Sequence, residues 1–304
     1  MILDTSIILK IFIFITFLFF NSDTSSANKT ETQTININKD KAEIFAPIVD
    51  TLLKRGIDSK FIINLINSEN TKFDEKYIKI NVTGYLQKVD YSHNYKGKSL
   101  IKTKEFLIQY DSLLAEVSNK YQVNKEIIVA ILWVETKLGT YTGNNHIPSV
   151  FLSTALVNLP KYIEINISEI DSTKYSKDEY NNLVNKIYKR SQKKSSWAIN
   201  ELIAMYELEQ ENKLKFDNIY GSWAGAFGYS QFLPSSYKKW AVDGNNDNYI
   251  NLFEFEDAVY SIANYLKVHG WNNNNEEQQR KAIFAYNNSN KYVDAVLILS
   301  KKLK

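Results

Sequence analysis

The sequence contains no cysteine, and this absence excludes several kinds of site at once. The chain can form no disulfide, no thiolate metal site, no cysteine nucleophile and no lipid anchor on an N-terminal cysteine. Histidine is scarce, and the three residues His93, His146 and His269 are scattered rather than spaced like ligands. A zinc site needs several suitable groups near one another, and no HExxH motif occurs. We therefore expect each histidine to be structural.

Charge of one sign is not in excess. The 37 basic and 34 acidic residues leave a net charge of +3, which indicates neither a nucleic-acid partner nor a membrane surface. Phosphate-binding motifs are missing too, because the chain has neither GxGxxG nor GK[ST]. With 304 residues, 44% of them hydrophobic, it is long enough to bury a substantial core.

Long apolar runs are missing except at the N-terminus. The run from Ile11 to Phe20 is short for a helix that crosses a bilayer, which needs about 20 apolar residues. Small residues follow at Ser25 to Ala27, as in a cleavage site. We expect residues 1–27 to be a signal peptide, with an uncleaved N-terminal anchor as the alternative. The polar residues 28–41 are expected to form a flexible spacer.

Helical patterns dominate the rest of the chain, and alternating strand patterns are few. We therefore predict a mainly α fold over residues 42–304. The predicted helices are Ala42–Lys54, Ser59–Ile66, Leu100–Tyr121, Lys125–Leu138, Lys177–Arg190, Trp197–Glu209, Pro234–Val242, Glu256–His269, Glu276–Tyr286 and Lys291–Leu303. Asn124 is expected to cap the fourth helix and Gly139 to terminate it. Residues 212–228 are expected to be irregular.

Glu135 lies in the otherwise apolar run EIIVAILWVETKLG. On a helix, Ile127, Ile128 and Ile131 share its face. Burial of a carboxylate costs free energy unless it is compensated, so two interpretations are open. Either the side chain reaches solvent at the helix end beside Lys137, or apolar walls raise its pKa and make it a general acid near neutral pH.

The stretch GSWAGAFGYSQFLPSSYKKW combines glycine, aromatic and polar residues before a helix that Pro234 can start. Glycines let the backbone approach a ligand closely, and aromatic faces with a few polar groups suit a sugar. The aromatic residues are Trp223, Phe227, Tyr229 and Phe232, and the polar ones are Ser222 and Gln231. The segment AYNNSNKYVDAV adds a second polar and aromatic cluster. The alternative is a packed turn whose aromatic residues fill the core.

The stretch DGNNDNYINLFEFED places oxygen-bearing side chains at alternate positions. They are Asp243, Asn245 and Asp247, followed by the carbonyl of Tyr249. This is the order of ligands in an EF-hand loop, with Glu254 at its last position. Asn248 stands where the loop usually has glycine, and asparagine tolerates the left-handed conformation that the turn requires. The alternative is a solvated turn without metal.

Four segments together, VETKLG, GSWAGAFGYSQFLPSSYKKWAVDGNNDNYINLFE, DAVYSIANYLKVHGW and AYNNSNKY, resemble the membrane-bound lytic murein transglycosylase B family. Their order and spacing match over Tyr121 to Trp271 and over Ala282 to Val296, whereas residues 42–120 match only as a helical N-terminal part. The resemblance implies a lysozyme-like, mainly helical catalytic domain over residues 42–304. It also implies an enzyme that cleaves the β-1,4 bond between N-acetylmuramic acid and N-acetylglucosamine in peptidoglycan.

In this family a single acid performs the chemistry, and the resemblance assigns that role to Glu135. It implies that Glu135 protonates the glycosidic oxygen and then accepts the proton of the muramic C6 hydroxyl, which closes a 1,6-anhydro ring. Most glycosidases use two carboxylates instead, and no second acid stands in an equally apolar stretch. Two alternatives are a hydrolytic muramidase with the same acid and a non-catalytic peptidoglycan-binding protein.

The resemblance also implies the groups that hold the glycan and a structural calcium ion. The glycan-binding residues are Ser222, Gln231, Tyr265, Tyr286, Asn287 and Tyr292. The calcium ligands are Asp243, Asn245, Asp247, the Tyr249 carbonyl and Asp257. The closing carboxylate of the calcium loop then comes from Asp257, so Glu254 is not expected to be a ligand.

The sequence departs from the family in three places. Without the lipidated cysteine of the namesake, we expect a periplasmic enzyme that is soluble or is held at the membrane by its N-terminal helix. A basic pair often follows the proline that matches Pro160, but here Lys161 and Tyr162 follow, which leaves recognition of the stem peptide open. Between Trp271 and Tyr286 the chain is short, so one subdomain is expected to be absent or minimal.

Overall fold

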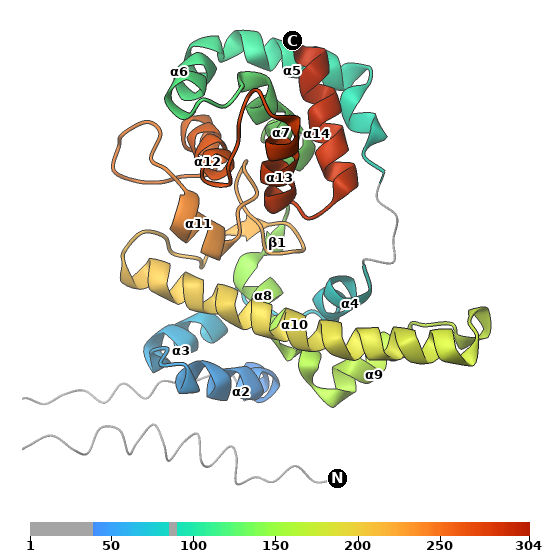
Figure 1. The fold of residues 1–304 in the computed structure, drawn as a ribbon. Coiled ribbons are helices and arrows are strands. Elements are labelled where there is room, and N and C mark those ends of the chain that lie inside the picture. Colours follow the sequence, from blue (N-terminus) through green and yellow to red (C-terminus); the bar gives the residue numbers. More distant parts are fainter. Residues whose placement is uncertain (1–38, 85–89) are drawn as a thin grey trace, which may run out of the picture.

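The computed structural model describes residues 39–84 and 90–304, and the regular structure in these ranges is mostly helical (Figure 1). The α-helices are α2 (Lys39–Lys54), α3 (Ser59–Asn67), α4 (Glu75–Thr83), α5 (Lys98–Gln109), α6 (Asp111–Tyr121), α7 (Lys125–Thr136), α8 (Ile147–Ala155), α9 (Pro160–Ser168), α10 (Lys177–Gln210), α11 (Pro234–Trp240), α12 (Phe255–Val268), α13 (Glu276–Tyr286) and α14 (Asn290–Leu303). The 3₁₀ helices are η2 (Ser92–Tyr95), η3 (Leu156–Asn158) and η4 (Ser172–Lys174). Two short strands, β1 (Asn145–His146) and β2 (Tyr220–Gly221), pair antiparallel. The predicted mainly helical fold is confirmed.

The helices pack in two groups, each around its own hydrophobic core (Figure 1). The first group contains α2, α3, α4, α8, α9 and α10, and its core includes Phe45 and Phe151. The second group contains α5, α6, α7, α12, α13 and α14, and its core includes Ile128 and Val296. Tyr286, at the end of α13, packs against both cores, so this helix end lies where the two groups meet.

One long helix replaces two predicted ones. The predictions Lys177–Arg190 and Trp197–Glu209 were separated by a serine-rich stretch, but α10 runs through it without a break. Ser191 and Ser195 are buried there, and the Ser195 hydroxyl donates a 2.6 Å hydrogen bond to the carbonyl of Ala155, the last residue of α8. Because the neighbouring segment supplies an acceptor, the serine does not compete for the backbone of its own helix.

The single predicted helix Leu100–Tyr121 is wrong, because the structure has two helices there, α5 and α6. Tyr110 lies between them with φ −109° and ψ 23°, and its ring packs 4.4 Å from Phe106 and 5.1 Å from Phe255. Helices α4, α8 and α9 were not predicted. Every residue of α8 is buried, so the helix has no polar face to reveal its period in the sequence.

The predicted boundaries of α3, α11, α12 and α14 differ from the observed ones by one or two residues, and α13 agrees. Residues 212–228 are irregular except for β2.

Helix α2 begins at Lys39, so the predicted spacer is wrong for its last three residues. The predicted signal peptide or anchor at 1–27 and the spacer residues 28–38 lie outside the described residues. Within residues 39–84 and 90–304, no helix is both long and apolar enough to cross a membrane.

Candidate active site

Glu135 lies in the last turn of α7, and the residues of this helix from Ile127 to Trp133 are buried in the second helix group. The hydroxyl of Tyr292 on α14 donates a 2.6 Å hydrogen bond to Oε1 of Glu135. The carboxyl group therefore points toward α14, although the side chain keeps partial access to solvent. The bond to Tyr292 favours the interpretation of Glu135 as a general acid over the one in which its side chain only reaches solvent beside Lys137.

Burial raises the pKa of Glu135 from 4.5 to about 7. Two smaller effects lower this pKa: the hydrogen bond from Tyr292 and the positive charge of Lys137. Desolvation disfavours the charged form of a carboxyl, and a donor or a cation favours it. The balance leaves a carboxyl group that is about half protonated near neutral pH, as a general acid and base requires.

Three tyrosines surround this carboxyl group. Tyr292 is 1% exposed, and the ring of Tyr91 meets it edge-on with centroids 5.9 Å apart. Burial first, and then the negative charge of Glu135, raise the pKa values of Tyr91, Tyr286 and Tyr292 above the ordinary value for tyrosine. All three hydroxyls consequently stay protonated at neutral pH and can act as hydrogen-bond donors.

The chain leaves α7 through three successive residues with left-handed backbone. Their φ angles are 52° at Lys137, 59° at Leu138 and 80° at Gly139. Helix α7 thus ends at Thr136, and the predicted end at Leu138 is wrong. Gly139, the predicted terminator, is favoured by its left-handed backbone and also by space, because a Cβ there would lie 2.8 Å from the ring of Tyr229. Asn124 occupies the N-cap position, but its side chain makes no capping hydrogen bond.

Residues 221–232 form a compact turn held by their own backbone. Isolated bridges pair Gly221 with Phe227 and Phe227 with Phe232. Phe227 and Phe232 are buried in the first core, so the expectation that they offer flat faces to a ligand is wrong. Tyr229 is half-buried, and Trp223 is 47% exposed. Trp223 is therefore the aromatic side chain of this turn that is most open to a ligand.

The polar residues of this turn shape its backbone. The Ser222 hydroxyl accepts a 3.1 Å hydrogen bond from the N–H of Ala226. Gln231 has φ 51°, and its Nε2 donates to the carbonyls of Thr142 at 3.1 Å and Gly228 at 2.9 Å. Both side chains are half-buried. Each therefore has a structural task, and a role for either in glycan binding stays a prediction.

The other predicted glycan-binding residues lie on α12 and at the end of α13. Tyr265 donates a 2.7 Å hydrogen bond to the carbonyl of Ala285, and its ring stacks on His269 with centroids 4.0 Å apart. The rings of Tyr265 and Tyr286 meet edge-on at 4.8 Å. Tyr265 therefore contacts Tyr286, and Tyr286 lies close enough to Glu135 for the charge of that carboxyl group to raise its pKa. Asn287 is the half-buried residue directly after α13.

The predicted calcium loop wraps around two carboxylates. Asp243 accepts hydrogen bonds from the N–H groups of Asn246 at 2.7 Å and Asn248 at 2.8 Å. Asp257 is fully buried and accepts from Gly244 at 2.7 Å and from Asn251. Asn248 has φ 70°, so the left-handed turn predicted at this position is confirmed.

The donor set of this loop is rich in oxygen but is not a preformed cluster of acids. In residues 39–84 and 90–304, no three His, Cys, Asp or Glu side chains converge as a metal site. The amide of Asn245 donates to Asp247 at 3.1 Å and to Glu254 at 3.3 Å. The ion pairs between described residues involve neither Asp243 nor Asp257. The charge and the oxygen donors suit a hard cation such as calcium.

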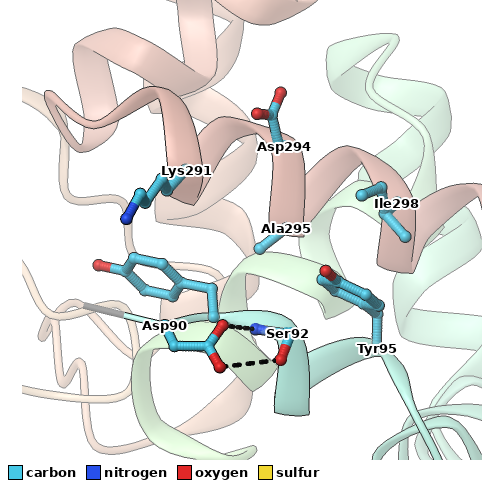
Figure 2. A pocket seen from close by; sticks show the side chains of 8 residues that line it. Asp90, Ser92, Tyr95, Lys291, Asp294, Ala295 and Ile298 are labelled. Carbon is cyan, nitrogen blue, oxygen red and sulfur yellow. Dashed lines mark hydrogen bonds between the residues drawn. The ribbon is translucent and has the colours of Figure 1, made fainter. Parts of the chain in front are cut away.

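A separate hollow of about 410 Å³ lies between η2 and α14 (Figure 2). It is lined by Asp90, Tyr91, Ser92, Tyr95, Lys291, Asp294, Ala295 and Ile298. Figure 2 shows the Asp90 carboxylate accepting hydrogen bonds from the N–H and the hydroxyl of Ser92, at 2.8 Å and 3.0 Å. None of the predicted site residues lines this hollow. Tyr91, which lines the hollow, also contacts the carboxyl site through its ring contact with Tyr292.

Comparison with known proteins assigns the chain to a family. The family model described as the transglycosylase SLT domain matches residues 41–281. The chain belongs to this family. Membrane-bound lytic murein transglycosylase B of Escherichia coli (strain K12) is 36% identical to it over 166 residues. The match covers 55% of this chain but 37% of that relative, so it spans little more than a third of the relative's length.

Solved structures of transglycosylases share the fold. The Escherichia coli lytic transglycosylase Slt35 in complex with bulgecin A has a TM-score of 0.65 at 19% identity, over 91% of this chain and 98% of that one. SltB3 from Pseudomonas aeruginosa in complex with NAG-anhNAM-pentapeptide has a TM-score of 0.62 at 18% identity, over 88% and 79%. Slt35 in complex with calcium has a TM-score of 0.64 at 19% identity, over 91% and 98%. The predicted lysozyme-like helical fold is confirmed by these likenesses.

Two residues near the end of α7 in this SLT-domain protein were not predicted to matter. Tyr91 lies in a short polar stretch without a motif, 44 positions before Glu135. Asn94 is buried and accepts a hydrogen bond from the Lys137 ammonium group. Both belong to the loosely matching N-terminal part, and only the fold brings them to the end of α7.

Proposed function

We propose that this chain is a lytic transglycosylase. It cleaves the β-1,4 bond between N-acetylmuramic acid and N-acetylglucosamine in peptidoglycan and leaves 1,6-anhydro-N-acetylmuramic acid ends. The observation that carries the proposal is the Glu135 carboxyl at the end of an apolar helix, bonded to Tyr292, with a pKa of about 7. Family membership supports it, as does the relative named membrane-bound lytic murein transglycosylase B.

The reaction has two steps that use one carboxyl group. Protonated Glu135 first donates its proton to the glycosidic oxygen as the bond from that oxygen to C1 of the muramic residue breaks. The resulting carboxylate then accepts the proton of the C6 hydroxyl as the C6 oxygen bonds to C1. Glu135 recovers its proton, no water is consumed, and the new end is an anhydro ring. A pKa near the working pH serves both steps, because neither form of the carboxyl is strongly favoured.

Tyr292 holds the carboxyl group in place for both steps. The Tyr292 hydroxyl donates a hydrogen bond to Oε1 of Glu135, whereas Oε2 accepts no hydrogen bond from the part of the chain that the structure describes. Oε2 is thus the oxygen that is free to exchange a proton with the substrate. Because the pKa of Tyr292 is raised well above the ordinary value, it remains a donor while Glu135 changes charge.

A single-acid mechanism fits the other buried carboxyl groups. Contrary to the expectation from sequence, Glu201 is also buried, with 3% of its surface exposed. The Glu201 carboxylate accepts two hydrogen bonds from Ser235 at the start of α11, one from the backbone N–H at 2.9 Å and one from the side-chain hydroxyl at 2.8 Å. The carboxylate of Asp257 accepts hydrogen bonds from the backbone of the predicted calcium loop, residues 243–257. Each of these groups has a structural role, so Glu135 is left as the acid for catalysis.

The glycan strand is held by the residues that the sequence pointed to. We assign this role to Ser222, Gln231, Tyr265, Tyr286, Asn287 and Tyr292. The ring contact between Tyr265 and Tyr286 and the effect of the Glu135 charge on Tyr286 support a continuous row of side chains from α12 to the carboxyl site. The exposed ring of Trp223 offers a further face for a sugar.

In this proposal a calcium ion stabilises the predicted calcium loop, residues 243–257. Asp243, Asn245, Asp247, the Tyr249 carbonyl and Asp257 would hold it, and its contribution is structural. The left-handed turn at Asn248 and the oxygen-rich donor set support the assignment, as does the relative Slt35, whose structure is a complex with calcium.

The proposed enzyme acts outside the cytoplasm, in the periplasm, because its substrate is peptidoglycan. The catalytic domain extends from residue 42 to the last residue, 304. The signal peptide or anchor proposed at residues 1–27 rests on the sequence pattern alone.

The experiment that tests the function is digestion of purified peptidoglycan by wild type and by Glu135→Gln. Glutamine keeps the shape of the side chain but carries no transferable proton, and loss of general acid–base catalysis costs about 10²- to 10⁴-fold. Glu126→Gln, in the first turn of the same helix, serves as the control and is expected to keep its activity. Full release of soluble muropeptides by Glu135→Gln would show that another carboxyl is the acid.

A further inference from the structure

Lys137 directly follows α7 and folds back along the last turn of this helix. Its backbone is left-handed, with φ 52° and ψ 50°, and its N–H bonds to the carbonyl of Trp133 at 3.0 Å. The ammonium nitrogen donates to the same carbonyl at 3.3 Å and lies 5.2 Å from the centroid of the Trp133 ring. A left-handed conformation is unfavourable for a non-glycine residue, so its contacts must compensate.

The second partner of this ammonium group lies on another element. Asn94 is 1% exposed within η2, and its Oδ1 accepts a hydrogen bond from the Nζ of Lys137. Tyr91 immediately precedes η2, and its ring contacts that of Tyr292, which bonds to Glu135. The contacts form a closed circuit from the carboxyl through α14 and η2 to Lys137, two residues after Glu135.

We propose that Lys137 is a positioning residue for Glu135: its ammonium group, fixed by Asn94 and the Trp133 carbonyl, keeps a positive charge beside the carboxyl and ties the end of α7 to the turn that presents Tyr91. The inference rests on the proposed function. Within that reaction the carboxylate exists only between the two steps, and the ammonium group stabilises it at that stage.

The groups that face the carboxyl come from four places in the fold. Tyr292 faces it from α14, Tyr286 from the end of α13 and Tyr91 from the residue before η2, while Lys137 follows α7. The tyrosines are neutral, so Lys137 is the one cation among the described residues whose charge lowers the pKa of Glu135. Burial lowers the pKa of Lys137, and the negative charge of Glu135 opposes this effect in part.

The test is the titration of the Glu135 carboxyl, followed by carbon NMR of protein labelled at glutamate, in wild type and in Lys137→Met. Methionine keeps a long apolar side chain but removes the charge and both hydrogen bonds. We expect the midpoint of the Glu135 titration to move to higher pH, since a neighbouring cation favours the carboxylate. Lys137→Arg is expected to keep the wild-type midpoint. Asn94→Ala releases the ammonium group and should shift the midpoint in the same direction as Lys137→Met.

A second readout is the pH dependence of kcat/KM on peptidoglycan fragments. The alkaline limb reports loss of the proton from Glu135, so we expect it to move to higher pH in Lys137→Met and to stay in place in Lys137→Arg. Lys104→Met, an exposed lysine of α5, is the matched control. A general loss of stability would lower activity at every pH without moving the limb.

The two proposals fail in different ways. An unchanged Glu135 titration in Lys137→Met overturns the role of Lys137, whatever happens to turnover. An equal shift in Lys137→Arg overturns it as well, because the charge would then not be the cause. Absence of anhydro products from the wild-type protein would instead refute the proposed function, and the titration would still report the effect of the Lys137 charge on Glu135.

Discussion

The hydroxyl of Tyr292 donates a 2.6 Å hydrogen bond to Glu135 across 157 residues of sequence. This bond joins the end of α7 to the first turn of α14 within one helix group. It stabilises the charged form of the carboxyl group, whereas burial stabilises the neutral form. The chemistry proposed for the protein depends on this balance, so the predictions below concern the groups that set it.

Tyr292→Phe should weaken catalysis and move its pH dependence. The variant keeps the buried ring but loses a donor to a charged group, which is worth about 1.5–3 kcal/mol, so we expect kcat/KM to fall roughly ten- to a hundredfold. Because the bond lowers the pKa of Glu135, its loss should move the alkaline limb to higher pH. Tyr260→Phe is the control, since the ring of Tyr260 is also buried and its hydroxyl donates to a carboxylate, that of the exposed residue Glu116. Equal losses in both variants would contradict the prediction.

Glu135→Gln should make the folded protein more stable at alkaline pH. The folded-state pKa of Glu135, about 7, is higher than the ordinary 4.5, so the wild type loses stability as pH rises between these values. The difference corresponds to at most about 3 kcal/mol, and partial solvent access reduces it. Urea denaturation at pH 5 and pH 8 should show a gain from the substitution that is larger at pH 8. Glu105→Gln, an exposed position on α5, should show no such pH-dependent gain.

Gly139→Ala should destabilise the protein more than Gly56→Ala. Both glycines are left-handed, with φ 80° and 79°, so both substitutions introduce backbone strain of roughly 1 kcal/mol. A Cβ at Gly56 has nothing within 4 Å, whereas one at Gly139 meets the Tyr229 ring at 2.8 Å. Overpacking adds about 1–3 kcal/mol, which chemical denaturation can resolve. Equal destabilisation by the two substitutions would mean that the ring of Tyr229 moves aside freely.

Calcium should raise the melting temperature of the wild-type protein. A ligand that binds only the native state at 100 times its Kd adds about 2.7 kcal/mol, enough to raise the midpoint by several degrees. Asp243→Ala removes a proposed ligand and should abolish the difference between calcium and chelator. Melting would be followed in both conditions for both proteins. Four identical midpoints would remove calcium from the proposal.

Much of the helical fold could be predicted from sequence where a helix has one buried and one exposed face. The prediction failed where tertiary contacts replaced local signals. Ser191 and Ser195 resemble a break between helices, yet α10 continues because Ser195 finds an acceptor on a neighbouring segment. Helix α8 lacks a polar face and therefore a visible period. Phe227 and Phe232 share a turn with exposed Trp223, and no local feature indicates which rings are buried.

The candidate site was predictable only in part. Glu135 attracts attention because a carboxylate interrupts an apolar helix, and this irregularity is visible in a single sequence. Tyr91 and Asn94 carry no comparable signal, since an isolated tyrosine or asparagine in a polar stretch is ordinary. Their contacts depend on how η2 packs against α14 and the end of α7, which is a property of the fold.

The central claim is that Glu135 acts as both acid and base on a substrate whose own hydroxyl is the nucleophile. It is tested most directly by mass spectrometry of the muropeptides released from purified peptidoglycan in water enriched in ¹⁸O. The predicted products end in 1,6-anhydro-N-acetylmuramic acid, carry no ¹⁸O from the cleavage, and disappear with Glu135→Gln. Reducing ends that contain ¹⁸O would identify a hydrolytic muramidase instead, and absence of any product would leave only a protein that binds peptidoglycan.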